Sequence, residues 1–260
     1  MNKTADQPKI TNRQQEILLL LYKFRYLNRI QIQTLLNHKY KSLVQNWLNE
    51  LVKQKLIIRY YDNKVAANPA VYALDKAGRK FLKSDKDVNI EALNRVWREK
   101  NYSYVFRDHS QFVADIYLYL QKYCVEMKAR LIFRTKTEMY GVEHFIKPGP
   151  DAYFAIEYSK DDIKRYFLDM FDDIPPVAMR KRVKELLSYY ESDEWQDNAD
   201  KEFPEIILVC PNPRIKSHLF HFIKNKLREN EEPIFFLAIK YAVASKGLTR
   251  ETLQKVTIAE

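Results

Sequence analysis

The spacing of apolar residues changes from a helical period to strand-like runs near residue 55, and this change constrains the fold more than any other feature. Before it, Thr11 is a plausible helix N-cap, and apolar residues recur at intervals of three and four in three helical segments, the third over residues 41–54. After it, residues 56–61 are typical of a strand, residues 62–64 of a turn and residues 71–74 of a returning strand, and a capped helix follows over 75–82. Three helices, a β-hairpin and a closing helix predict a winged helix-turn-helix.

The third predicted helix has an apolar stripe and a polar face. We expect the stripe to be buried; it consists of Leu43, Val44, Trp47, Leu48, Leu51 and Val52. The opposite face carries Ser42, Gln45, Asn46, Asn49 and Lys53. Amide and hydroxyl groups can hydrogen-bond to base edges, Asn and Gln to adenine in particular, so we predict that this face reads double-stranded DNA. Basic residues on either side are expected to contact phosphates: Lys39, Lys41 and Lys53, with Arg59 and Lys64 from the wing.

The positive charge of the chain is concentrated in its N-terminal part. Residues 1–100 contain 20 Lys and Arg against 9 Asp and Glu, a net +11, whereas the other 160 residues contain 24 basic and 25 acidic side chains. A basic domain binds phosphate backbones through counterion release, although an anionic membrane or an acidic protein would also attract it.

Other features exclude several classes of protein. Four glycines in 260 residues argue against a glycine-rich phosphate loop or a dinucleotide-binding motif. The two cysteines have no metal-ligand spacing and indicate a reducing compartment. The N-terminus has no apolar signal-peptide core, and the longest apolar run, 17–21, is too short to span a bilayer. We therefore expect a cytoplasmic protein with no membrane partner.

The second part of the chain is predicted to be a separate α/β domain. The charge-rich segment 84–100 suggests a linker with a boundary near residue 88, which gives domains of 1–87 and 88–260. A long helix is expected over 102–123, followed by three strands with short connections, a helix, a strand, a helix and a strand. The acidic run 191–200, with Trp195, is interpreted as an exposed loop. The overall expectation is an α+β chain with a mixed α/β second domain.

Two acids in this second domain resemble the signature of PD-(D/E)xK nucleases. Asp151 follows Pro150 at the start of the second predicted strand, and Asp169 lies on the third. Two carboxylates on neighbouring strands can share a Mg²⁺ ion, with Glu138 as a possible third ligand. Phe171 stands where the signature has its lysine, so we select Arg182 on the following helix as the substitute cation. Arginine cannot act as a general base, but it can stabilise charge on phosphate.

Several short motifs resemble the replication-relaxation family of plasmids and mobile elements. They are His109-x-x-x-Val113-x-Asp115-Ile116, Pro150-Asp151 after the segment with Glu138, and an acidic strand before a basic helix ending in Tyr189-Tyr190. The resemblance implies a winged helix joined to a degenerate nuclease-like domain. The Glu-x-Asp that this family usually has on the third strand is Asp169-Met170-Phe171 here, which puts metal binding in question.

Three functions therefore stay open at this point. The first is a DNA-binding protein of a plasmid or mobile element that acts in replication control, mobilisation or transcription, with a second copy or a replication protein as partner. The second is a metal-dependent nuclease or nickase that uses Asp151, Asp169, Glu138 and Arg182. The third is a protein-interaction module. No cofactor is required by the sequence, and Mg²⁺ is the ion that an active site of this type would take.

Overall fold

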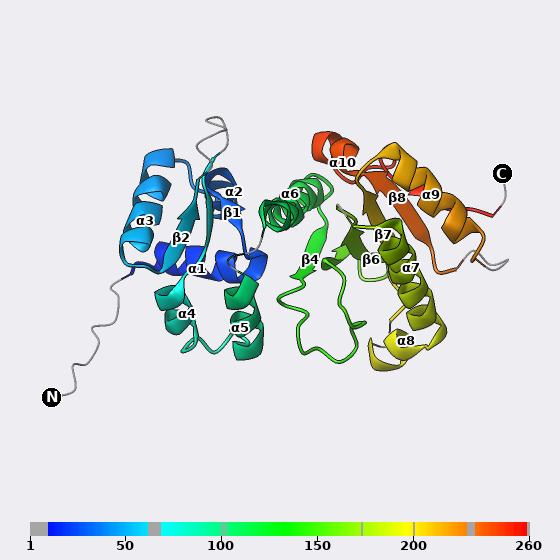
Figure 1. The fold of residues 1–260 in the computed structure, drawn as a ribbon, viewed down its shortest axis with the longest axis horizontal. Coiled ribbons are helices and arrows are strands. Elements are labelled where there is room, and N and C mark those ends of the chain that lie inside the picture. The colour runs from blue at the N-terminus through cyan, green and yellow to red at the C-terminus, as the bar shows by residue number, and fades with distance from the viewer. Residues whose placement is uncertain are drawn as a thin grey trace. The chain divides into compact units, whose positions relative to one another are not determined.

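The computed structural model describes residues 10–61, 69–99, 101, 103–172, 174–199, 201–227 and 232–258. It divides the chain into two compact units, residues 1–114 and 115–260, so that the division falls within helix α6 (Tyr104–Glu126). Figure 1 shows the elements of both units, which are described separately below.

The first unit contains the three helices, the two hairpin strands and the closing helix that the sequence predicts for its first 83 residues, together with a short strand, β1, and a further helix, α5, that it does not predict. In chain order they are α1 (Asn12–Phe24), β1 (Leu27–Asn28), α2 (Arg29–Leu35), α3 (Lys41–Lys53), β2 (Ile57–Tyr60), β3 (Val71–Leu74), α4 (Lys76–Leu82) and α5 (Ile90–Glu99). The strands form an antiparallel sheet in the order β1-β3-β2. Leu27 and Asn28, which interrupt the helical pattern in the sequence, form the third strand of this sheet by pairing with Tyr72 and Val71. The predicted turn at 62–64, including Lys64, lies outside the described residues.

Side-chain caps mark the starts of helices α1, α2 and α4, whereas α3 has none. Thr11 and Gln14 form a capping box at α1, and Asn28 and Gln31 form another at α2, so each pair satisfies backbone donors that a helix start leaves open. The carboxylate of Asp75 accepts a hydrogen bond from the Lys76 backbone N–H at 2.7 Å at the start of α4. Local sequence therefore sets where the helices begin, and the buried apolar residues then pack them together.

Helix α3 buries a narrower stripe than the sequence indicates. Val44, Leu48 and Leu51 are fully buried, but Leu43 is 43% exposed, so the prediction that Leu43 is buried is wrong. The physical reason is the helical period: successive residues turn by about 100°, so a stripe through positions 44, 48 and 51 directs residue 43 outward.

The first unit extends beyond the boundary expected at residue 88. The Nε of Arg25, just after α1, lies 3.0 Å from a carboxylate oxygen of Glu99 at the end of α5, and both side chains are almost completely buried. The hydroxyl of Tyr26 donates to the backbone carbonyl of Glu99 at 2.5 Å. On α6, the ring of Phe106 packs edge-on against Tyr26 at 6.0 Å. Residues 90–114 thus belong to the first unit.

The second unit is a mixed six-stranded sheet with helices on both faces. Its elements are the second half of α6, β4 (Arg130–Thr135), β5 (Ala152–Glu157), β6 (Ile163–Met170), α7 (Pro176–Glu191), α8 (Glu194–Ala199), β7 (Glu205–Cys210), α9 (Pro213–Lys224), β8 (Phe235–Ile239), α10 (Lys240–Lys246) and β9 (Gln254–Lys255). The strand order is β4-β5-β6-β7-β8-β9. Strands β4, β5 and β6 form the expected antiparallel meander, and β7 and β8 join it in parallel through helical crossovers. In the described part of the chain, no helix is long and apolar enough to cross a membrane.

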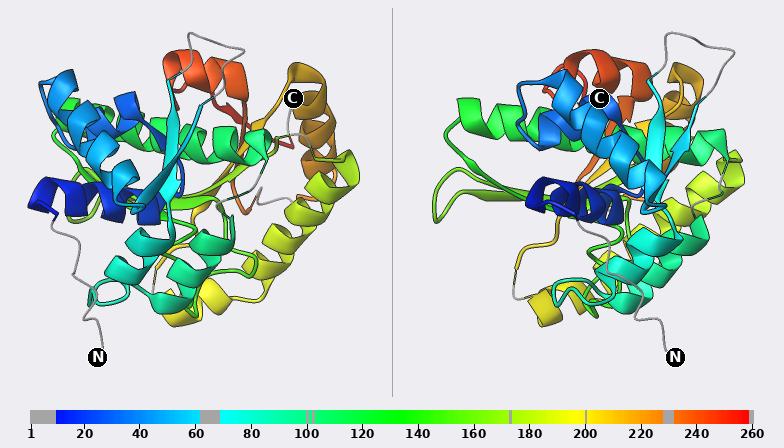
Figure 2. Two further views of the ribbon diagram at one scale, coloured as in Figure 1. Left: turned by 60° about the vertical axis from the view of Figure 1, so that its left-hand side comes forward. Right: turned by 90° about the vertical axis from the view of Figure 1, so that its left-hand side faces the viewer.

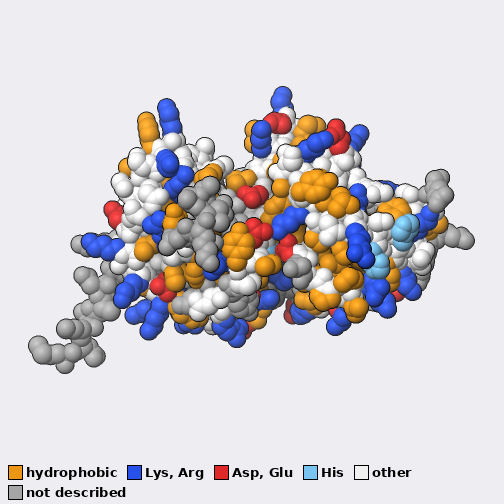
Figure 3. Space-filling model, turned by 45° about the horizontal axis from the view of Figure 1, so that its top comes forward, with side chains coloured by type: hydrophobic (Ala, Val, Ile, Leu, Met, Phe, Trp, Pro, Cys, Tyr) orange, Lys and Arg blue, Asp and Glu red, His pale blue; other side chains and the backbone are white. Residues whose placement is uncertain are grey.

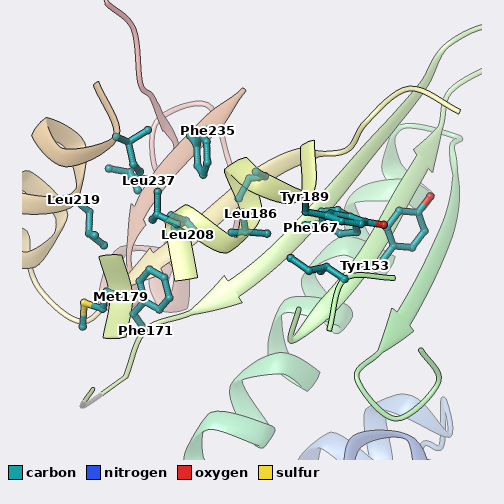
Figure 4. Close-up of a cluster of buried hydrophobic side chains, with 14 of the residues drawn as sticks. Tyr153, Phe167, Phe171, Met179, Leu186, Tyr189, Leu208, Leu219, Phe235 and Leu237 are labelled. Atoms are coloured by element: carbon teal, nitrogen blue, oxygen red, sulfur yellow. The ribbon is translucent and has the colours of Figure 1, made fainter. Parts of the chain in front are cut away.

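The main core of this unit lies between the sheet and helices α7, α8 and α9 (Figures 1 and 2). Figure 4 shows Phe167 and Phe171 of the β6 segment facing Met179, Leu186 and Tyr189 of α7. Trp195 is 1% exposed and lies on α8, so the interpretation of residues 191–200 as an exposed loop is wrong. The indole N–H of Trp195 donates to the carbonyl of Glu202 at 3.0 Å, which explains how its polar edge is satisfied in the core.

Candidate functional sites

Helix α3 presents a row of polar side chains to solvent. Ser42, Asn46, Asn49 and Lys53 are all exposed, and their offsets of four, three and four place them on one helix face. Gln45 is half-buried, and its amide nitrogen donates to the side-chain oxygen of Asn49 at 3.0 Å. The face chosen from the sequence is therefore continuous and accessible, with an amide pair already aligned along it.

The turn before α3 is held by a histidine. The ring of His38 packs edge-on against Trp47 of α3 at 4.9 Å, and its Nδ1 accepts a hydrogen bond from the Tyr40 backbone N–H at 3.2 Å. Tyr40, at the start of α3, is 57% exposed, and Leu43 lies one turn further along. These contacts hold the turn against α3. Tyr40 and Leu43 are two hydrophobic side chains exposed at the start of α3, and sequence reasoning did not select them for DNA contact.

Basic side chains flank this row. Lys39 and Lys41 are exposed at the start of α3, and Arg59 is exposed on β2, where its guanidinium lies 5.5 Å from the centre of the Tyr61 ring. Lys64 lies outside the described residues. In the view of Figure 3, Lys and Arg side chains project from many separate points rather than from one block. Charge alone therefore does not outline a binding surface, and α3 is distinguished by its polar row.

In the second unit the two predicted acids meet at one end of the sheet. Strands β5 and β6 are paired so that Ala152 lies opposite Leu168, which places Asp151 beside Asp169. The backbone N–H of Asp151 donates to a carboxylate oxygen of Asp169 at 3.3 Å, and the backbone N–H of Met170 donates to a carboxylate oxygen of Asp151 at 2.9 Å. Each carboxylate thus accepts a hydrogen bond from the backbone of the segment that carries the other acid.

Two cations accompany these two acids. The Nε of Arg182 on α7 donates to the second carboxylate oxygen of Asp169 at 2.7 Å, and another guanidinium nitrogen donates to the carbonyl of Pro148 at 2.8 Å. The Nζ of Lys136, just after β4, lies 3.6 Å from the other oxygen of Asp151. The structure therefore brings Arg182 to the acids, as the sequence suggested. It also adds Lys136, which sequence reasoning missed because no motif links the end of β4 to the start of β5.

Phe171, which stands where the nuclease signature has a lysine, belongs to the hydrophobic core of the second unit. Asp169 and Phe171 are two residues apart and so project from the same face of β6, where Phe171 is 3% exposed and packs with Met179 beneath α7. The cation at this end of the sheet consequently comes from α7 instead of from the strand.

The pKa of the Asp169 carboxyl depends on its burial and on the charged groups beside it. Burial raises the pKa of the Asp169 carboxyl above its ordinary value, while the Arg182 guanidinium lowers it and the nearby Asp151 raises it. Burial is the largest of these influences on the Asp169 pKa, and the contact with Arg182 is the strongest one that opposes it.

This cluster does not fit a Mg²⁺ site. Both oxygens of Asp169 accept hydrogen bonds, and Asp151 is engaged by Met170 and Lys136. Glu138, the expected third ligand, turns back to accept from the backbone N–H and hydroxyl of Thr135 at 2.9 and 3.2 Å. Among the described residues, no three His, Cys, Asp or Glu side chains are grouped so that they could hold a metal ion. The acids are already neutralised by two cations, so a metal would have to displace Arg182 or Lys136.

The fold and the sites together define a mixed α+β chain, with an exposed polar helix in the first unit and a cluster of paired acidic and basic side chains in the second. A family model described as Replication-relaxation matches residues 18–205, which is most of both units. The chain belongs to this family. No curated protein sequence matches the chain.

Solved structures that resemble the chain cover less than half of it. RV1404 from Mycobacterium tuberculosis is 19% identical over 44% of this chain and 73% of its own, with a TM-score of 0.27. The MepR–DNA complex of S. aureus is 24% identical over 45% of this chain and 81% of its own, with a TM-score of 0.25. The adhesin competence repressor AdcR of Streptococcus pyogenes is 21% identical over 48% of this chain and 85% of its own, with a TM-score of 0.26. At these TM-scores the likeness is too low to support a conclusion about this chain.

Proposed function

We propose that the protein binds double-stranded DNA and acts in replication control, mobilisation or transcription regulation of a plasmid or mobile element. In this proposal the first unit is a winged helix-turn-helix, with α2 and α3 as the helix-turn-helix and β2 and β3 as the wing strands. Membership of the Replication-relaxation family supports a role on DNA.

The single observation that carries the proposal is the exposed row along α3. An α-helix fits the major groove of DNA, where Asn and Gln amides pair with adenine and Ser pairs with several base edges. Asn46 and Asn49 are exposed on this helix, and Gln45 lies beside them. The exposed Leu43 side chain, about one turn before Asn46, suits apolar contact with a thymine methyl group.

The basic residues around α3 would contact the phosphate backbone of the DNA. Lys39 and Lys41 at the start of the helix, and Lys53 at its end, are spaced to reach phosphates on either side of the groove, with Arg59 from the wing. Such contacts give affinity without sequence information, whereas the amides supply the choice of site. The two groups of residues therefore have separable roles that mutation can distinguish.

We further propose that the second unit serves as a binding platform for a second copy or a replication protein, and that it does not cleave DNA. Its strand order and paired acids support a relationship to PD-(D/E)xK nucleases. The ion pairs of Asp169 with Arg182 and of Asp151 with Lys136 support loss of the metal site. These pairs would fix the end of the sheet where β5 begins and β6 ends.

Two measurements on the full-length protein test these proposals. The first is fluorescence anisotropy with a labelled duplex over a range of salt concentrations, in which we expect binding that weakens steeply as salt rises. The absence of salt-dependent binding would instead favour a protein-interaction module. The second is incubation with supercoiled plasmid and increasing Mg²⁺ or Mn²⁺, in which we expect no nicking. Metal-dependent nicking that disappears in Asp169→Asn would establish the nuclease alternative.

A further inference from the structure

A second site lies within the second unit, on the sheet face opposite helices α7 and α9. Side chains alternate along each strand, so Tyr153 and Ala155 of β5 enter the main core while Phe154 and Ile156 project from the other face. That face carries a cavity of about 660 Å³, within the range of about 300–1,000 Å³ typical of small-molecule sites. It lies apart from the cluster around Asp169, whose side chain projects toward α7.

The floor and walls of the cavity are aromatic. Phe154 and Tyr166 are stacked with their ring centres 4.8 Å apart, and Phe236 of β8 continues the floor. The second half of α6 supplies a wall with Tyr119 and Tyr123. Flat aromatic surfaces of this kind accept another flat ring by stacking.

The position of Tyr119 depends on a glycine. Gly247 adopts a positive φ of 73°, and a Cβ atom built there would lie 1.9 Å from the Tyr119 ring. Only a glycine permits this contact, so the backbone at Gly247 is shaped to hold the ring in the cavity wall. Close packing against Gly247 therefore fixes the Tyr119 ring in the cavity wall.

The charged groups around the cavity are few and mostly positive. Lys164, Arg250 and Lys255 are exposed around the cavity, against one carboxyl, that of Glu205. The register places Lys164 opposite Ile156, and Lys255 opposite Phe236, so two of the cations stand next to the apolar floor. The Glu205 carboxyl lies near the Tyr166 hydroxyl and supplies a polar acceptor inside an aromatic site.

We propose that this cavity binds a nucleotide, with its base stacked on the tyrosines and its phosphate held by Lys164, Arg250 and Lys255. Aromatic platforms beside cations are how proteins hold unpaired nucleotides, because the base needs stacking and the phosphate needs positive charge. A purely aliphatic ligand would use the floor but not the cations, and an inorganic anion would use the cations but not the rings. Glu205 can accept hydrogen bonds from the amino or ring N–H groups of a base.

The nucleotide can come from either of two sources: a free mononucleotide or an unpaired nucleotide of a single strand. The inference does not rest on α3 binding duplex DNA, because all of the residues involved belong to the second unit.

The test uses the fluorescence of 2-aminopurine, which stacking on tyrosine quenches, with the full-length protein. Four probes are compared: 2-aminopurine deoxyribonucleoside, its 5′-monophosphate, the same base within single-stranded oligothymidine, and the same base paired in a duplex. We expect saturable quenching with the monophosphate or the single strand, and binding of the nucleoside weaker by about tenfold or more because it lacks the phosphate contacts. Quenching by the monophosphate indicates a free ligand, whereas quenching only by the single strand indicates unpaired DNA.

Variants assign the signal to the cavity. The double variant Lys164→Ala/Lys255→Ala should weaken monophosphate or single-strand binding by about tenfold or more. The control Lys184→Ala/Lys226→Ala, which removes an exposed lysine of α7 and one just after α9, should not. Leu253→Trp, which fills the cavity, should abolish quenching, and thermal melting shows whether each variant is folded. If no probe is quenched in a saturable way, or if folded Lys164→Ala/Lys255→Ala binds like the wild type, the proposal is wrong. Equal binding of nucleoside and monophosphate by the wild type would also overturn it, without any variant.

Discussion

The Nε of Arg182 lies 2.7 Å from a carboxylate oxygen of Asp169, and both side chains are about nine-tenths buried. This pair joins the middle of α7 to the end of β6, and it occupies the place where a nuclease-like site would need a free carboxylate. The same guanidinium also binds the carbonyl of Pro148 in the segment before β5. One arginine therefore ties together the three elements that meet at this end of the sheet.

Removing that arginine should destabilise the second unit. We expect Arg182→Met to lower the free energy of unfolding by about 3–5 kcal/mol, because it leaves the buried Asp169 carboxylate without its partner. Lys181→Met, at a neighbouring position whose side chain is 78% exposed, should change stability by less than about 0.5 kcal/mol. Chemical denaturation of both variants checks this. The double variant Asp169→Asn/Arg182→Met should recover part of the loss, and an Arg182→Met protein as stable as the wild type would show that the pair has no structural role.

Glu205 gives the second unit a specific pH dependence. Burial is the main cause that raises the pKa of Glu205 above its ordinary value of 4.5, so the folded state holds the proton more tightly than the unfolded state. That contribution to stability is complete below pH 4.5 and is lost as the pH rises through the folded-state pKa. We therefore expect the difference in melting temperature, wild type minus Glu205→Gln, to fall between pH 4 and pH 7. A difference that is constant or rises over this range would contradict the assignment.

Gly78 is required by close packing in the first unit. A Cβ atom at this position of α4 would lie 2.1 Å from the carbonyl oxygen of Leu56, so the helix can approach this backbone only through a glycine. Gly78→Ala should cost about 1–3 kcal/mol of stability in thermal or chemical unfolding. Gly149→Ala is the matched control, since its nearest contact would be 3.7 Å, and it should be close to neutral. Equal effects of the two substitutions would mean that the approach of α4 to Leu56 is looser than the structure indicates.

The extent of the first unit can be tested by truncation. A chain ending at Ala114 should unfold cooperatively, because it keeps α5, the Arg25–Glu99 ion pair and the first half of α6. A chain ending at Val88 leaves the Arg25 guanidinium without Glu99 and exposes the surface that α5 covers, so it should melt at a lower temperature. Calorimetry of the two fragments distinguishes these results. Identical melting temperatures would support the boundary near residue 88 that the charge-rich segment suggests.

The sequence predicted local structure well because caps, turns and periodicity are local signals. Thr11 and Asp75 mark helix starts in both sequence and structure, and the change of period near residue 55 coincides with the start of β2. Leu43 was misjudged because the sequence shows an apolar residue next to a stripe but not the width of the stripe. Trp195 was misjudged because its acidic neighbours suggested a loop, whereas burial of one indole in the core decided the local structure.

Tertiary relationships were predictable only where a motif or a strand order implied them. The meander of β4, β5 and β6 predicted that Asp151 and Asp169 lie at the same end of the sheet, and their backbone hydrogen bonds show that they do. Lys136 has no spacing relationship to either acid and could be found only from the structure. The aromatic cavity is equally hidden, because its residues come from α6, five strands and a loop far apart in the sequence.

The central claim is that α3 reads bases while the surrounding lysines hold phosphates, and one measurement tests it most directly. The triple variant Gln45→Ala/Asn46→Ala/Asn49→Ala is compared with the wild type for binding to a duplex selected from a random library and to random duplex of the same length. Each lost bidentate contact should cost about 1–3 kcal/mol on the selected duplex only, so the variant should bind both duplexes alike. Lys41→Ala should instead weaken binding to both and reduce the salt slope by about one, and Lys86→Ala, an exposed lysine outside α3, should do neither. Preference for the selected duplex that persists undiminished in the triple variant would contradict the account.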